Sequence, residues 1–267
     1  MDFELIKLDI DSQIATLSFN DPDNLNAINQ TMLDSLDLAL DHVEDPDNNI
    51  RCLILTGAGR GFCAGANMAR DAAEEDGAAS NRLADPGSGL EKFYHPILRR
   101  LRNLHCPIVS AVNGPCAGIG MSFALMGDMV LAGKSAFFLQ AFRRIGLVPD
   151  GGATFLLPRL VGMARAKELT LMGERLSADD ALEWGLINRV FEDDALLGEA
   201  RTLAGELAKG PMSLGMIRNL LWESVDSTYE EQLNNERWAQ REAGRSKDFV
   251  EGVRAFNEKR DANFSGK

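Results

Sequence analysis

Two short runs of the chain are built almost wholly of apolar and small residues, at 52–55 and 107–112. Strands of this kind suit a sheet that is buried on both faces, because a strand with one solvent-facing side alternates apolar and polar residues. Each run leads into a loop rich in small residues, at 57–65 and 113–120. These two strands favour an α/β fold in which helices cover the sheet.

The rest of the chain alternates between strand and helix patterns. Residues 3–10 and 13–19 alternate apolar and polar side chains about a short turn, which predicts a β-hairpin. Further strands are expected at 129–132, 136–138 and 186–191. Helices are expected at 31–43, 90–104, 121–126, 156–160, 164–172, 178–184, 194–209 and at three places within 211–256. We therefore expect an α/β core over residues 1–200 and a helical region over residues 201–267, with residues 71–88 as an excursion from the core.

The charge balance excludes some classes of partner. The chain of 267 residues carries 40 acidic and 28 basic side chains, a net charge of −12, which argues against nucleic acid or an anionic membrane as a partner. The arginines at 99–102 and 143–144 could bind a small anion or could form solvated helix faces. No signal peptide and no apolar stretch long enough to cross a bilayer is visible, so we expect a soluble, cytoplasmic protein.

The four cysteines lack the spacing of a metal site or a disulfide framework. They occur singly, with no CxxC pair and no histidine at ligand distance. Free thiols in a reducing compartment are expected, and no metal centre.

Asp150 is the residue with the most direct bearing on chemistry. It is a lone acid in the apolar, glycine-rich segment 146–152, where proline and glycine permit a tight bend. Burial in such a turn raises the pKa of a carboxyl group towards that of a general base. Asp is also a common N-cap, so Asp150 could instead cap a helix that begins near Ala153. The local sequence leaves both interpretations open.

The two small-residue loops, 61–67 and 113–120, could together bind a developing negative charge. A loop that opens a helix exposes unpaired backbone N–H groups, which can receive an anion or a polarised carbonyl oxygen. Two such loops side by side would form an oxyanion hole. Tight packing of a strand on a helix also calls for small residues, so each loop alone decides little. The second loop is neither GxGxxG nor a P-loop, which disfavours a nucleotide-phosphate site.

In this order, the motifs resemble the crotonase superfamily, also called the enoyl-CoA hydratase/isomerase family. The resemblance covers essentially the whole chain, and its blocks are NLNAI at 24–28, CAGAN at 63–67, AVNGPCAGIG at 111–120, GLVPDGG at 146–152, the segment 157–190 and the tail at 256–260. It implies a spiral of ββα turns whose C-terminal helices pack a homotrimer or a dimer of trimers. It also implies acyl-CoA thioester substrates and no separate cofactor, because coenzyme A is part of the substrate.

The same resemblance assigns roles to individual positions. The backbone amides of Ala66 and Ile119 would donate to the thioester oxygen, and Gly118 would shape the second loop. The residues that map to the CoA and acyl channel are Leu25, Ala27, Ala64, Asn67 and Met68. Phe256 and Lys259 match tail positions that approach CoA, often from a neighbouring subunit.

Two positions depart from the pattern of the hydratases in this family. Those enzymes use two glutamates, which map here to Ser122 and Phe142. Adding water to a double bond needs one group to activate the water and another to protonate carbon, and neither side chain can do this. Ordinary hydratase activity is therefore not expected. Both positions remain expected substrate-binding residues, with Ser122 either orienting the substrate or simply packing its helix.

The acid that remains, Asp150, resembles the ring-epoxide and Δ3,Δ2-enoyl-CoA isomerase branch of the family, as in phenylacetyl-CoA catabolism. One carboxylate is sufficient there, because it removes a proton beside the thioester and returns it elsewhere. A second branch, the arylacyl-CoA dehalogenases, uses an aspartate in this turn as nucleophile with a histidine base, which would correspond to His95. His95 could equally be a helix-entry residue beside Pro96. A scaffold that binds CoA esters without converting them is a third hypothesis.

Overall fold

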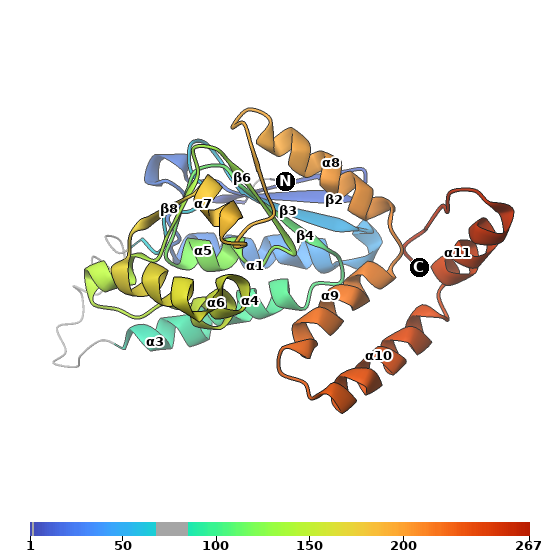
Figure 1. Ribbon diagram of the computed structural model, residues 1–267. Helices are drawn as coiled ribbons and strands as arrows, with labels where there is room; N and C mark the ends of the chain where they lie inside the picture. The colour runs from blue at the N-terminus through green and yellow to red at the C-terminus, as the bar shows by residue number, and fades with distance from the viewer. Residues whose placement is uncertain (2, 68–84) are drawn as a thin grey trace.

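A six-stranded sheet forms the centre of the computed structural model, which describes residue 1, residues 3–67 and residues 85–267 (Figure 1). Its strand order is β1-β2-β3-β4-β6-β9. These strands are β1 (Ile6–Asp11), β2 (Ile14–Phe19), β3 (Cys52–Gly57), β4 (Ile108–Val112), β6 (Met129–Gly133) and β9 (Arg189–Phe191). The predicted hairpin is confirmed, since β1 and β2 pair antiparallel. All other pairs in this sheet are parallel.

Every residue of β3 and β4 is buried, as the two apolar runs predict. Both strands lie in the middle of the sheet, with parallel neighbours on each side. The carboxyl ends of parallel strands meet at one edge of a sheet. The loops that follow β3 and β4 therefore emerge side by side.

A second sheet of three strands lies beside that edge. It contains β5 (Pro115–Ala117), β7 (Phe137–Leu139) and β8 (Arg175–Ser177), with β5 parallel and β8 antiparallel to β7. The sequence predicted β7 but neither β5 nor β8. β7 is wholly apolar (FFL), whereas β5 (PCA) and β8 (RLS) have no such local signal and form through pairing with β7.

Helices cover both faces of the large sheet. In Figure 1, α8 (Leu196–Lys209) lies above the sheet and α1 (Gln30–Glu44) below it. α8 presents a row of small residues, Ala200, Ala204 and Ala208, to the buried side chains of β3 and β4. The side chain of Asn29 accepts a hydrogen bond from an amide in the first turn of α1, which caps that helix.

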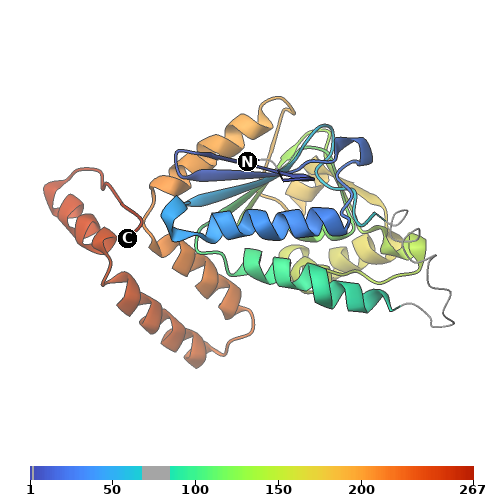
Figure 2. The ribbon, with the colours of Figure 1, turned by 180° about the vertical axis from the view of Figure 1, so that it is seen from behind.

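The remaining helices complete the core and the C-terminal region. Around the core are α3 (Pro86–Gly89), α4 (His95–Arg102), α5 (Ile119–Ala124), α6 (Ala153–Met172) and α7 (Ala178–Glu183). Three short 3-10 turns are Pro22–Asn24, Pro46–Asn48 and Ala141–Ile145. Seen from behind, α4 runs beside α1 (Figure 2).

Two predicted helices differ in detail. The helix predicted over 90–104 is a π-helical turn, Leu90–Tyr94, that continues into α4. The two helices predicted at 156–160 and 164–172 are the halves of α6, which is kinked at Gly162, where φ is 77°.

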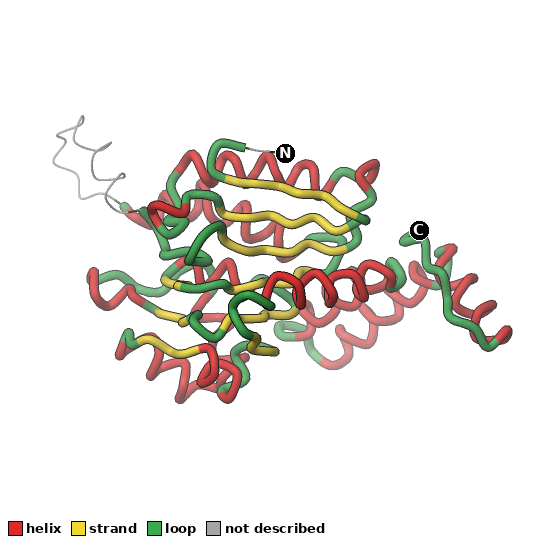
Figure 3. Tube along the Cα trace, turned by 90° about the horizontal axis from the view of Figure 1, so that it is seen from above, coloured by secondary structure: helices red, strands yellow, loops and turns green. Residues whose placement is uncertain are grey.

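The C-terminal helices α9 (Ser213–Ser224), α10 (Tyr229–Ala243) and α11 (Lys247–Glu258) extend away from the sheet (Figures 1 and 3). Arg218 of α9, only 4% exposed, anchors them to the core. Its guanidinium donates to the Asp128 carboxylate and to the carbonyls of Leu101, Arg102 and Leu104 at the end of α4. The expected start of the C-terminal region, residue 201, lies inside α8.

The two arginine groups support the fold. Arg100 joins α4 to α1 through Asp37, Asp41 and Glu44. Arg143 and Arg144 donate to the last carbonyls of α6 and to that of the residue following it. The guanidinium groups of Arg100, Arg143 and Arg144 therefore already have protein partners.

The four cysteines are free and buried. In the part of the chain that the structure describes, no helix is both long and apolar enough to cross a bilayer.

Candidate active site

Asn26 anchors the first loop. Its side chain is fully buried, and its Nδ2 donates to the carbonyls of Gly61, at 2.7 Å, and Ala58, at 3.0 Å. Its Oδ1 accepts the backbone N–H of Asp21 at 2.8 Å. The sequence placed Asn26 in a motif without giving it a role. The available signal was the residue type, because asparagine tolerates the left-handed conformation found here, with φ of 58°.

The segment that contains Asn26 runs alongside the first loop. The N–H of Ala64 donates to the carbonyl of Leu25 at 3.0 Å, and the N–H of Asn67 donates to the carbonyl of Ile28 at 2.8 Å. Four residues predicted to line the substrate channel, Leu25, Ala27, Ala64 and Asn67, are thus on paired backbone segments. All four are partly exposed. The fifth, Met68, lies outside the described residues.

The two loops pack directly on each other. Cys63 and Cys116 form an isolated parallel β-bridge, and the N–H of Ala117 donates to the carbonyl of Cys63 at 2.9 Å. A Cβ added to Gly118 would lie 3.9 Å from the Cα of Gly65. The residues that precede the two expected oxyanion donors are therefore neighbours in space.

The amides of Ala66 and Ile119 are free to bind a substrate oxygen. In the parallel bridge between Ala66 and Ile28, the Ile28 and Asn67 amides make the hydrogen bonds. Ile119 is the first residue of α5, where backbone N–H groups lack an intrahelical partner. Among the described residues, neither amide donates to a protein acceptor. This arrangement is suited to stabilising an oxyanion.

Phe142 covers the second loop. Its side chain is 8% exposed, and its ring lies 3.7 Å from the point where a Cβ on Gly118 would stand. Gly118 has φ of 52° and ψ of −128°, a conformation that other residues rarely adopt. The second hydratase position is thus an apolar wall.

Asp150 is half-buried and lies in the segment 146–152, which follows Phe142 in the chain. Its Oδ1 is buried and makes no hydrogen bond within the described structure. Burial raises the pKa of Asp150 from 3.8 to about 6, although its own backbone N–H partly offsets this. The carboxyl group can therefore hold or release a proton near neutral pH, as a general acid–base must.

The alternative that Asp150 caps α6 through its side chain is wrong. The N-cap of α6 is Gly152, and no side chain caps that helix. Asp150 contributes only its backbone carbonyl, which accepts the N–H of Ala153 at 3.0 Å. The carboxyl group therefore does not cap α6.

The first hydratase position, Ser122, touches the turn directly. Its side chain is fully buried, and its Oγ donates to the backbone carbonyl of Asp150 at 3.0 Å. The sequence expected a substrate contact or plain helix packing here and did not foresee this partner.

Two other predicted residues are not brought to the turn by this chain. Phe256, 83% exposed, and Lys259 lie at the end of α11, which Figure 1 places at the opposite end of the molecule from α6. His95 begins α4 and is half-buried. No described hydrogen bond or ion pair joins it to Asp150.

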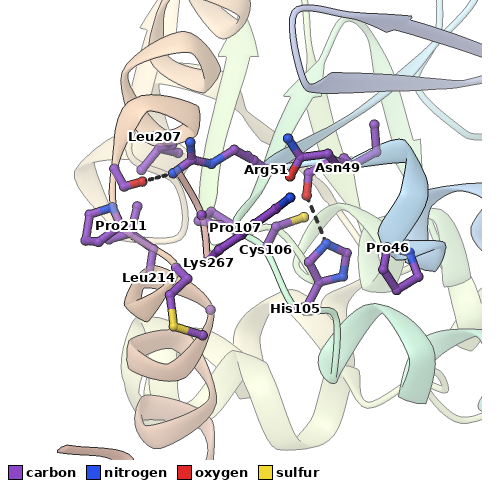
Figure 4. A pocket seen from close by; sticks show the side chains of 15 residues that line it. Pro46, Asn49, Arg51, His105, Cys106, Pro107, Leu207, Pro211, Leu214 and Lys267 are labelled. Carbon is purple, nitrogen blue, oxygen red and sulfur yellow. Dashed lines mark hydrogen bonds between the residues drawn. The ribbon is translucent and has the colours of Figure 1, made fainter. Parts of the chain in front are cut away.

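A pocket of about 250 Å³ lies elsewhere, where β3 and β4 begin (Figure 4). Two of its polar lining side chains, Arg51 and His105, already have partners. The Arg51 guanidinium donates to the carbonyl of Gly210, and the ring of His105 bonds to the carbonyl of Ile50. The pocket lies at the amino ends of these strands, whereas the loops of the candidate site follow their carboxyl ends.

Comparison with known proteins identifies the family of the chain. A model of the enoyl-CoA hydratase/isomerase family matches residues 9–267. The 1,2-epoxyphenylacetyl-CoA isomerase of Escherichia coli (strain K12) is 45% identical over 265 residues, 99% of each chain. The 4-chlorobenzoyl coenzyme A dehalogenase-1 of an Arthrobacter species is 32% identical over 219 residues, covering 81% of this chain and 77% of that protein. The crystal structure of an enoyl-CoA hydratase from Polaromonas sp. JS666 matches with a TM-score of 0.88 and 32% identity, over 97% of this chain and 99% of that one.

Proposed function

Because the chain belongs to the enoyl-CoA hydratase/isomerase family, we propose that it isomerises an acyl-CoA thioester with Asp150 as the proton shuttle. The observation that carries this proposal is the state of the Asp150 carboxyl group. It is half-buried, one of its oxygens has no hydrogen-bond partner among the described residues, and its pKa is raised to about 6. It lies beside α5, whose first amide is a free donor.

The proposed reaction needs one carboxylate. Ionised Asp150 removes a proton from the carbon next to the thioester, and the C–H electron pair moves onto the thioester oxygen to give an enolate. The Ala66 and Ile119 amides hold that oxygen, each contributing roughly 3 kcal/mol. The protonated carboxyl then returns the proton to a different carbon, and the double bond moves. No water is consumed, and substrate and product have the same composition.

Hydration is the less favoured reaction, although the structural relative named above is a hydratase. The two positions that would supply its acids hold Ser122 and Phe142. Ser122 is committed to a backbone carbonyl, and Phe142 has no ionisable group. One carboxyl group would have to activate water and protonate carbon in the same addition.

A hydrolytic reaction is the second candidate, and similarity to the dehalogenase favours it. Asp150 would attack a halogen-bearing carbon of the acyl group and displace halide, and water activated by His95 would then hydrolyse the resulting ester to give the hydroxylated product and free Asp150. This route predicts a covalent ester on Asp150 and a loss of turnover in a His95→Gln variant. The isomerase proposal predicts neither.

A panel of CoA esters tests these reactions against one another. The purified protein is incubated with a 3-enoyl-CoA, a 2-enoyl-CoA, an aryl-epoxide CoA ester and a halo-aryl-CoA, and products and protein are followed by mass spectrometry. We expect an isomer of unchanged mass from the 3-enoyl or epoxide ester. A product heavier by one water, release of halide, or an acyl adduct on the protein would overturn the proposal.

We further propose that the chain assembles as a trimer or a dimer of trimers and works in the cytoplasm without a cofactor beyond the coenzyme A of its substrate. Exposed apolar side chains on the projecting helices support the assembly, namely Leu221, Trp238, Phe249, Val253 and Phe256. Phe256 and Lys259 would then approach the CoA of a neighbouring subunit. Sedimentation as a monomer at micromolar concentration would contradict the assembly.

A further inference from the structure

Two donors fix the backbone carbonyl of Asp150. Ser122 Oγ donates to it at 3.0 Å, and so does the N–H of Ala153, also at 3.0 Å. A carbonyl oxygen offers two lone pairs, and both are used here. The peptide group between Asp150 and Gly151 is therefore held in a single orientation.

Ser122 lies on the helix that also carries an expected oxyanion donor. Ile119 and Ser122 are three residues apart in α5, so they share a face of that helix. A Cβ added to Gly151 would lie 2.3 Å from Ile119 Cδ1 and 2.7 Å from Ser122 Cβ. The turn that bears the acid is thus seated on the first turn of α5.

The carboxyl group itself has no comparable restraint. In the part of the chain that the structure describes, Asp150 Oδ1 is buried and has no hydrogen-bond partner, so the direction of the carboxyl group depends on the backbone that carries it. Ser122 is fully buried, and water does not compete for its hydrogen bond. An error in the orientation of this peptide group would move the carboxyl group relative to the reacting carbon.

We propose that Ser122 is a positioning residue for Asp150. Through the backbone carbonyl it sets the direction of the carboxyl group relative to the Ile119 N–H, and it does so without touching substrate. The inference rests on the proposed function, since it requires Asp150 to move the proton. It replaces the substrate contact that the sequence suggested for Ser122.

Single substitutions separate positioning from the other roles. Ser122→Ala is expected to lower kcat about 10-fold, the effect of roughly 1.4 kcal/mol from one lost hydrogen bond. The dissociation constant of a saturated acyl-CoA, measured by calorimetry, is expected to stay within about 2-fold, because the bond serves the acid and not the ligand. Ser122→Cys, which nearly keeps the volume but donates weakly, should fall between.

Ser110 provides a matched control. Ser110 is also fully buried and lies within β4, but its Oγ has no hydrogen-bond partner in the described structure. Ser110→Ala should leave both kcat and the dissociation constant unchanged. If Ser122→Ala proves too unstable to assay, Ser122→Cys carries the same comparison.

A double-mutant cycle gives the decisive readout. If Ser122 acts only through the Asp150 carboxyl group, Ser122→Ala should cause no further loss of the residual rate in the Asp150→Asn background. An unchanged kcat in Ser122→Ala, weaker binding of saturated acyl-CoA, or an additive loss in that background would each overturn the inference. A fully active Asp150→Asn variant would overturn the proposed function itself, which is a distinguishable result.

Discussion

Gly151 and Ile119 are so close that a Cβ at position 151 would lie 2.3 Å from Ile119 Cδ1. Gly151 directly follows the acid, and Ile119 contributes an expected oxyanion amide. The proposed site of proton transfer and the proposed site of charge stabilisation are therefore in direct contact here. This contact exists only because position 151 has no side chain.

Gly151→Ala is predicted to destabilise the protein and to impair turnover. Its φ of 57° costs a non-glycine residue roughly 1–2 kcal/mol, and the added methyl group must displace Ile119. Gly152→Ala is the matched control, since Gly152 also has a positive φ, 85°, but a Cβ there would meet nothing within 4 Å. Urea unfolding and kcat measured on both variants check this. Equal losses in the two would show that the contact with Ile119 is unimportant.

The pH dependence of turnover should report the raised pKa of Asp150. The first step needs the ionised carboxylate, so kcat/KM should fall tenfold per pH unit below about 6. The measurement is a profile of kcat/KM against pH, made with a CoA ester that dissociates from the protein faster than it reacts. An acid limb near the ordinary pKa of an aspartate, roughly 4, would mean that the carboxyl group is solvated or that another group limits the rate.

Burial of the Asp150 carboxyl group should also lower the free energy of unfolding once that group is ionised. The folded pKa of Asp150, about 6, lies above its ordinary value of 3.8, so the folded state binds this proton more tightly than the unfolded state. The contribution of Asp150 is most favourable below pH 4 and is lost as the pH rises through 6. Asp150→Asn should therefore be more stable than the wild type at pH 8, by about 1–2 kcal/mol once partial exposure is discounted. Urea unfolding at several pH values measures the difference, and a difference that did not shrink towards pH 4 would contradict this assignment.

Asn26 is predicted to be essential for the first loop. Asn26→Ala would leave the Asp21 N–H and the carbonyls of Gly61 and Ala58 without their partner, at a cost of about 2–4 kcal/mol. Asn24→Ala is the control, because Asn24 is exposed and, among the described residues, its side chain bonds only to the Asp21 carboxylate. Thermal unfolding and kcat of the two variants compare them. A loss in Asn24→Ala as large as that in Asn26→Ala would remove the case for a loop anchor.

Much of the fold could be predicted because its signals are local. The buried strands β3 and β4, the N-terminal hairpin and the covering helix α1 each show a clear pattern along the sequence. The short strands β5 and β8 do not, since they are set by pairing with β7 across the chain. The kink at Gly162 likewise joins two segments that the sequence pattern shows as separate helices.

The candidate site could be predicted only in part, because only some of its residues have a local signal in the sequence. Asp150 stands out as a lone acid in an apolar turn. The structure agrees with the prediction that burial in this turn raises the pKa of its carboxyl group. The partner of Ser122 could not be foreseen, because the hydrogen bond spans 28 residues and involves a backbone atom. Phe256 and Lys259 carry no local signal for a site, and their predicted approach to CoA depends on a second copy of the chain.

Turnover of a 3-enoyl-CoA by Asp150→Asn, measured beside the binding of a saturated acyl-CoA, tests the central claim most directly. The amide keeps the shape of the side chain but cannot take up or return a proton. The proposed function predicts that kcat falls by about 10²–10⁴-fold, the usual contribution of a general acid–base, while the ligand binds as in the wild type. A variant that isomerises the ester at the wild-type rate would contradict the assignment of Asp150 as the proton shuttle.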